Sequence, residues 1–260
     1  MKTAPRILST LIVSAGVLAC APVAVGQTGT SVNDGDWPNI HGEISSQRYS
    51  PLDQINAKNV ADLEIAWRFS TKGFGRVTDY VNPSTPIEVD GILYANVGIT
   101  RNVVALDATS GQVLWMFRYN EGDRFDEAPR KGSGRGVSFW TDGDAQRIID
   151  VSPGYQMVSL DAKTGIPDLE FGTNGIVDLF EGVRNGDDPR YAYPEIGLSA
   201  PPLVMNDVIV VGAAHRGGGR PRSKFNTKGD VRGFDVRTGE LLWTFHTIPQ
   251  RGEIGFESWI

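Results

Sequence analysis

The sequence predicts an all-β fold, and three observations support that prediction. Glycine provides 31 and proline 15 of the 260 residues, so turns are frequent. Short runs rich in aromatic and β-branched residues lie between those turns, as is typical of strands. A pattern of strand, turn and strand also recurs along the chain. With 40% hydrophobic residues, the chain can build a sizeable core.

Charge and cysteine content exclude several classes of protein. The formal net charge is −6, from 25 Lys and Arg against 31 Asp and Glu. This acidic balance argues against nucleic acid as the main partner. The single cysteine, Cys20, excludes an internal disulfide framework and a zinc site of the CxxC type.

Residues 1–26 have the pattern of an export signal peptide. Lys2 and Arg6 precede an apolar run from Ile7 to Ala24, and small residues come before Gln27. The run is interrupted and short for a membrane span of about 20 residues. We therefore expect a mature chain that begins near Gln27 and resides in the bacterial periplasm.

Cys20 leaves a second possibility open. The segment Val17-Leu18-Ala19-Cys20 resembles a bacterial lipobox, in which the cysteine carries the lipid. The mature protein would then be a lipoprotein associated with a membrane. A location at the cell surface is a further alternative.

A repeat organises the rest of the chain. Its skeleton is apolar-Asp-x-x-[Thr/Ser]-Gly-x-x-x-[Trp/Leu]-x-Phe, and we expect each copy to form a hairpin with glycine at a positive-φ turn position. The full copies are Leu106–Phe117, Leu160–Phe171 and Phe234–Phe245, and Leu63–Phe69 matches the second half. A second strand-turn-strand element comes before each full copy, at Ser84–Tyr94, Phe139–Ile149 and Ser199–Val210.

Two hairpins per repeat make a four-stranded sheet, which is the blade of a β-propeller. The repeats are longer than the roughly 40–45 residues of a bare blade, so we expect inserted loops. These lie at Asn120–Gly134, Gly172–Gly197 and Ala213–Asp230. The predicted organisation is thus an N-terminal segment over residues 27–62 and an incomplete propeller of about four blades over residues 63–260, from a longer protein or one that needs a partner.

Several segments resemble the pyrroloquinoline quinone (PQQ)-dependent dehydrogenases. They are Asp36–Asn39, Gln47–Asn56, Gly134–Trp140, Ser199–Pro201 and Val231–Pro249, and Gly252–Trp259 is similar to the sugar-dehydrogenase-like branch. The resemblance implies an eight-bladed propeller with PQQ on its axis beside a calcium ion. It also implies oxidation of alcohols or sugars, with electrons passed to ubiquinone or to a cytochrome such as cytochrome c.

The resemblance assigns cofactor-binding roles to a few positions. Arg135 matches the family arginine that contacts PQQ, and a guanidinium suits a cofactor with three carboxylates. Ser152 matches a hydroxyl residue that hydrogen-bonds a PQQ carboxylate. Gly212, Ala213 and Ala214 match a wall of small residues beside the flat ring.

The sequence also departs from the family pattern. Pro129 and Arg130 stand where the alcohol branch has a vicinal disulfide. His215 and Arg216 follow the small-residue wall where that branch has a calcium-binding glutamate, so no metal ligand is assigned. The family's catalytic aspartate comes after Ile260, so we expect this chain alone to be inactive. The alternative function is a cofactor-free propeller that acts as a scaffold or binding lipoprotein.

Overall fold

The computed structural model describes residues 35–183, 195–216 and 227–259. The predicted signal peptide and Cys20 lie outside these residues. The described helices are one α-helix and two 3-10 turns, namely η2 (Val60–Asp62), α1 (Asp123–Glu127) and η4 (Phe256–Trp259). No helix within the described ranges is long and apolar enough to cross a membrane.

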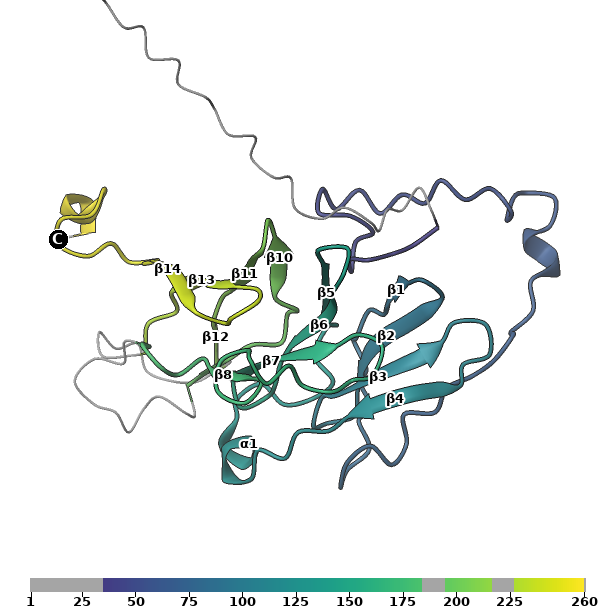
Figure 1. The fold of residues 1–260 in the computed structure, drawn as a ribbon, viewed down its shortest axis with the longest axis horizontal. Helices are drawn as coiled ribbons and strands as arrows, with labels where there is room; N and C mark the ends of the chain where they lie inside the picture. Colours follow the sequence, from purple (N-terminus) through teal and green to yellow (C-terminus); the bar gives the residue numbers. More distant parts are fainter. Residues whose placement is uncertain (1–34, 184–194, 217–226, 260) are drawn as a thin grey trace, which may run out of the picture.

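The strands form three antiparallel sheets of four strands each, which lie side by side in Figure 1. The first sheet contains β1 (Ile87–Val89), β2 (Ile92–Val97), β3 (Asn102–Asp107) and β4 (Val113–Phe117). The second contains β5 (Ser138–Thr141), β6 (Gln146–Val151), β7 (Gln156–Asp161) and β8 (Ile176–Asp178). The third contains β10 (Leu203–Met205), β11 (Val208–Val211), β13 (Val231–Asp235) and β14 (Leu241–Phe245). The separate pair β9 (Ile196–Gly197) and β12 (Ala214–His215) joins two inserted loops.

This architecture confirms the predicted all-β fold and its propeller blades. The first and third full repeats form the expected hairpins, β3 with β4 and β13 with β14. The preceding elements form β1 with β2, β5 with β6, and β10 with β11. The described residues therefore complete three blades, and Leu63–Phe69 contributes one tryptophan of a further blade unit.

The second repeat differs from the prediction at its returning strand. The strand was expected within Pro167–Phe171, but β8 lies further along the chain at Ile176–Asp178. Only an isolated bridge between Leu160 and Pro167 remains at the expected place. Proline has no backbone N–H and cannot continue a ladder of hydrogen bonds, which explains the displacement.

Tryptophans join the first blades to each other. Trp67 Nε1 donates a hydrogen bond to the Ala108 carbonyl at 3.0 Å, and Trp115 Nε1 donates to the Ala162 carbonyl at 2.9 Å. The main core between the first two sheets is apolar and includes Val103, Ile148 and Leu160, each with no exposed surface. Burial of these side chains supplies most of the energy that holds the blades together.

The junction between the second and third blades is different because Leu169 stands at the tryptophan position. Arg147 replaces the indole donor, and its Nη1 donates to the carbonyls of Val236 (3.1 Å) and Arg237 (3.0 Å). Trp140 Nε1 donates to Asp207 Oδ1 at 2.9 Å, which ties the same blades together from another strand. This junction therefore combines an apolar core with the hydrogen bonds of Arg147, which we call the Arg147 latch.

Candidate functional site

The inserted loops gather at one end of the three sheets. Because neighbouring strands run in opposite directions, the connections β2–β3, β4–β5 and β6–β7 all leave from the same end. The short Asp-Gly turns of the repeats lie at the opposite end. Contacts between loops of different blades confirm this grouping, because Arg101 of the β2–β3 turn reaches the Val151 and Leu198 carbonyls at 2.7 and 2.6 Å. We call this region the loop end, and every predicted site residue lies in it.

Arg135 is exposed at the loop end, three residues before the start of β5. Its carbonyl oxygen accepts a hydrogen bond from Thr85 N at 3.1 Å, so its backbone is held beside the segment that leads into β1. Arg135 thus lies where the segments that lead into the first strands of two blades meet. An exposed guanidinium in this place can receive a carboxylate ligand.

Ser152 lies in the turn between β6 and β7, but its hydroxyl group is already engaged. Ser152 Oγ donates to Glu121 Oε1 at 2.5 Å and accepts from Gln156 N at 3.1 Å. The residue is only 5% exposed. The geometry therefore directs the hydroxyl toward Glu121 rather than toward open space, and its predicted contact with PQQ stays a prediction.

Glu121 is a residue that the sequence did not single out. Burial raises the pKa of its carboxyl group, while the hydrogen bonds from Ser152 and Gly154 and the charges of Arg124 and Arg101 oppose that rise. The carboxylate accepts from Gly154 N at 3.0 Å as well as from Ser152. Glu121 lies in the Asn120–Gly134 insertion, which has no repeat pattern, so only its folded position reveals its role.

The small residues Gly212, Ala213 and Ala214 lie at the end of the third blade's β11 strand. Tyr155 donates its hydroxyl hydrogen to the Gly212 carbonyl at 2.8 Å, which fixes this segment against the second blade. A Cβ atom added to Gly212 would meet no atom within 4 Å. Ala213 packs partly against the core, and Ala214 pairs with Gly197 in the β9–β12 ladder. There is open space at Gly212, and the two alanines are occupied by packing.

The described residues do not assemble a metal site. No group of three or more His, Cys, Asp or Glu side chains among them could hold an ion. His215 Nε2 lies 2.8 Å from the Thr227 carbonyl, and the buried Glu195 accepts from Thr227 Oγ1 at 2.7 Å. In the described part of the chain, the residues that follow the small-residue wall thus serve loop structure.

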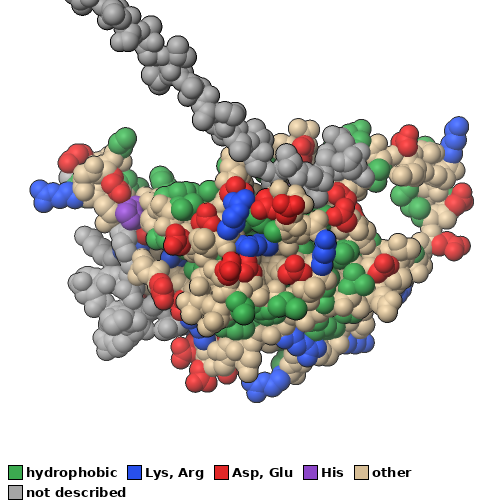
Figure 2. All heavy atoms as spheres, in the orientation of Figure 1, with side chains coloured by type: hydrophobic (Ala, Val, Ile, Leu, Met, Phe, Trp, Pro, Cys, Tyr) green, Lys and Arg blue, Asp and Glu red, His purple; other side chains and the backbone are tan. Residues whose placement is uncertain are grey.

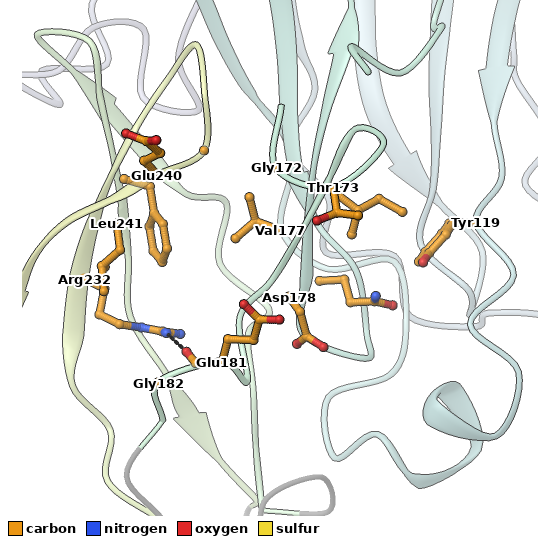
Figure 3. A pocket seen from close by; sticks show the side chains of 14 residues that line it. Tyr119, Gly172, Thr173, Val177, Asp178, Glu181, Gly182, Arg232, Glu240 and Leu241 are labelled. Carbon is orange, nitrogen blue, oxygen red and sulfur yellow. Dashed lines mark hydrogen bonds between the residues drawn. The ribbon is translucent and has the colours of Figure 1, made fainter. Parts of the chain in front are cut away.

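A separate pocket lies between the outer strands of the second and third blades (Figure 3). Its volume is about 620 Å³, and Val177 and Asp178 of β8 face Arg232 and Leu241 of the third blade across it. Its lining also includes Ile176 of the short β8 strand and Phe234 of β13. Arg232 donates to the carbonyls of Leu179 (2.5 Å) and Glu181 (2.8 Å), so its guanidinium ties the pocket wall together.

The three four-stranded antiparallel sheets define a β-propeller architecture. A family profile described as "PQQ: Glucose/ethanol/alcohol dehydrogenase, beta-propeller domain" matches residues 37–259. The chain therefore belongs to this family of PQQ-dependent dehydrogenase propellers.

Individual relatives agree with this membership. The chain is 30% identical to an alcohol dehydrogenase (quinone) dehydrogenase subunit of Gluconacetobacter polyoxogenes, over 95% of this chain and 31% of that protein. It is 32% identical to the quinoprotein glucose dehydrogenase of Escherichia coli K12, over 82% of this chain and 27% of that protein. The glycerol dehydrogenase large subunit of Gluconobacter oxydans is 26% identical over 86% of this chain. The chain thus spans about 30% of the length of these relatives.

Solved structures agree as well. The quinohemoprotein alcohol dehydrogenase ADHIIG of Pseudomonas putida HK5 superposes with a TM-score of 0.63 and 26% identity, over 88% of this chain and 30% of that one. The quinohemoprotein alcohol dehydrogenase of Comamonas testosteroni gives a TM-score of 0.61 and 26% identity, over 84% of this chain and 28% of that one.

Proposed function

We propose that this chain forms part of a periplasmic PQQ-dependent dehydrogenase that oxidises alcohols or sugars. The observation that carries the proposal is the position of Arg135, exposed at the loop end and held by the Thr85–Arg135 backbone hydrogen bond. Family membership over residues 37–259 supports it. The periplasmic location rests on the signal-peptide pattern of residues 1–26, and a lipidated Cys20 remains its alternative.

The residues at the loop end fit a polycarboxylate cofactor in part. Arg135 would bind its carboxylates through charge-assisted hydrogen bonds, and the open space at Gly212 would admit a flat ring. When bound, PQQ supplies a quinone that accepts a hydride from the substrate. This chain would bind and orient the cofactor through the positive charge of Arg135, whose backbone is held in place by the hydrogen bond from Thr85 N.

The remaining parts of the reaction are not assigned to described residues. We assign no catalytic base, and no calcium ligands are gathered in the parts of the chain that the structure describes. We therefore propose that this chain binds PQQ but does not turn over an alcohol or a sugar alone. Ubiquinone or cytochrome c would accept the electrons in the whole protein.

Calorimetric titration of the purified chain with PQQ, with and without CaCl₂, tests the proposal. The wild-type chain should bind, and Arg135→Ala should weaken binding by about 10- to 100-fold, because a charged hydrogen bond contributes about 1.5–3 kcal/mol. Arg118→Ala, which removes an exposed arginine at the start of the same loop, is the matched control and should bind like the wild type.

A second comparison separates the two predicted polar contacts. Because Ser152 donates to Glu121, Ser152→Ala should weaken PQQ binding much less than Arg135→Ala does. Equal losses for both variants would mean that the serine hydroxyl turns toward the cofactor. Failure of the wild-type chain to bind PQQ would contradict the proposal and favour a cofactor-free scaffold.

A further inference from the structure

Arg101 is the most extensively bonded buried side chain at the loop end. It lies at the end of the β2–β3 turn and is 5% exposed. Its donated hydrogen bonds all reach backbone carbonyl oxygens, which belong to Gly132 (3.2 Å), Val151 (2.7 Å), Leu198 (2.6 Å) and Arg130 (2.8 Å). Burial lowers the pKa of the guanidinium, and the nearby carboxylates of Asp150 and Glu121 oppose that shift. An arginine stays charged in such surroundings, so all its N–H groups remain donors.

The four carbonyls belong to the segments that carry the candidate site. Arg130 and Gly132 lie in the β4–β5 loop, a few residues before Arg135. Val151 comes directly before Ser152, and Leu198 lies on the path into the third blade. One side chain from the first blade therefore joins segments of the second blade to the segment that leads into the third.

Gly134, the residue directly before Arg135, lies against the Arg101 side chain. A Cβ atom added to Gly134 would lie 2.8 Å from Arg101 Nε and 3.2 Å from Arg101 Cζ. Gly134 also has a φ of 69°, a conformation that glycine adopts more readily than other residues. The backbone directly before Arg135 thus rests against the Arg101 side chain.

We propose that Arg101 is a positioning residue that holds Arg135 in the orientation that receives the cofactor's carboxylates. This inference rests on the proposed function. A guanidinium is a planar fork of donors, so it fixes the relative positions of its four acceptors more firmly than a flexible ammonium does. An ordered loop loses less conformational freedom when a ligand binds, and the ligand then binds more tightly. Arg101 itself has no contact with the cofactor in this role.

The test uses Arg101→Lys, which keeps a positive charge and up to three donors, and Arg101→Met, which removes both. Arg118→Lys is the matched control, because Arg118 is an exposed arginine at the start of the same β4–β5 loop. Hydrogen exchange of the amides in residues 130–136 and 151–155 is measured first, in the cofactor-free chain. We expect faster exchange in both segments for Arg101→Lys, with the β3 and β7 strands unchanged, and no effect of Arg118→Lys.

PQQ affinity then separates positioning from general stability. Arg101→Lys should weaken PQQ binding by about 10-fold in the wild-type background and by less than about 2-fold in an Arg135→Ala background, because coupled residues are not additive. Equal losses in both backgrounds, or unchanged exchange in residues 130–136, would overturn the inference. If Arg101→Met does not fold, Arg101→Lys still decides the outcome. If the wild-type chain does not bind PQQ, the proposed function fails, whereas hydrogen exchange still shows whether Arg101 fixes the Arg135 loop.

Discussion

The indole ring of Trp115 covers Gly165 of the neighbouring blade. A Cβ atom added to Gly165 would lie 2.4 Å from Trp115 Cε3, and Gly165 has a φ of 70°. Trp67 covers Gly111 in the same way, with a distance of 2.5 Å from the added Cβ to its ring. Each tryptophan therefore needs a glycine on the next blade, and this contact joins one repeat to its neighbour.

Gly165→Ala should strongly destabilise the protein. The added methyl group clashes with a buried indole and strains the turn, and we expect a loss of about 2–4 kcal/mol in the free energy of unfolding. Urea denaturation followed by circular dichroism measures it. Gly143→Ala is the control, because Gly143 has a φ of 100° and open space at its Cβ position. Equal losses for the two variants would mean that strain alone, and not the indole contact, sets the cost.

Arg147→Met should weaken the junction between the second and third blades. It removes the donor to the Val236 and Arg237 carbonyls and the ion pair with Asp168. The side chain of Arg147 is only 16% exposed, so water screens its interactions poorly. We expect Arg147→Met to lower the free energy of unfolding by about 2–3 kcal/mol, and Arg147→Lys to lower it by an intermediate amount.

Arg237→Met is the control for this latch. Arg237 pairs with Asp142 and Asp207, but its side chain is 43% exposed. Water screens such exposed ion pairs, so Arg237→Met should lower the free energy of unfolding, measured by urea denaturation, by at most about 1 kcal/mol. A larger loss for Arg237→Met than for Arg147→Met would contradict the assignment of Arg147 as the latch.

The sequence predicted the blades because their signals are local. The Asp and Gly of each repeat determine a turn within a few residues, and the repeat also marks Trp67 and Trp115, which contact the next blade. The Arg147 latch joins positions 89 residues apart, and no spacing rule connects Arg147 with Val236. The same limit applies to the site. Arg135 was assigned through its motif and its role stays a prediction, whereas Arg101 and Glu121 make contacts that only the folded loops create.

Asp150 should make stability depend on pH. Burial raises the pKa of its carboxyl group from 3.8 to about 6, although the positive charge of Arg101 opposes the rise. The folded protein therefore holds this proton more tightly than the unfolded chain. The resulting stabilisation is fully present below about pH 4 and is lost as the pH rises through 6.

Asp150→Asn isolates this effect, because asparagine does not titrate. Between pH 4 and pH 7, the free energy of unfolding of the wild type should fall by about 2 kcal/mol relative to that of Asp150→Asn. Urea denaturation at half-unit pH steps measures both profiles. Parallel profiles would show that Asp150 has an ordinary pKa in the fold.

The β14 strand should make the isolated chain self-associate. It lies at the edge of the third sheet, and Leu242 and Phe245 are 50% and 62% exposed. Trp243 is 42% exposed, whereas Trp115 at the corresponding place in the first blade is 9% exposed. Charged side chains of both signs are interspersed with hydrophobic ones over the visible face in Figure 2. An exposed apolar edge strand offers unpaired backbone groups to a second chain. Leu242→Lys should therefore shift the chain toward monomer in sedimentation velocity runs across a concentration series.

Leu114→Lys, at the same position of β4 in the first sheet and 49% exposed, should leave the distribution unchanged. Equal shifts for the two variants would show that association depends on net charge rather than on β14.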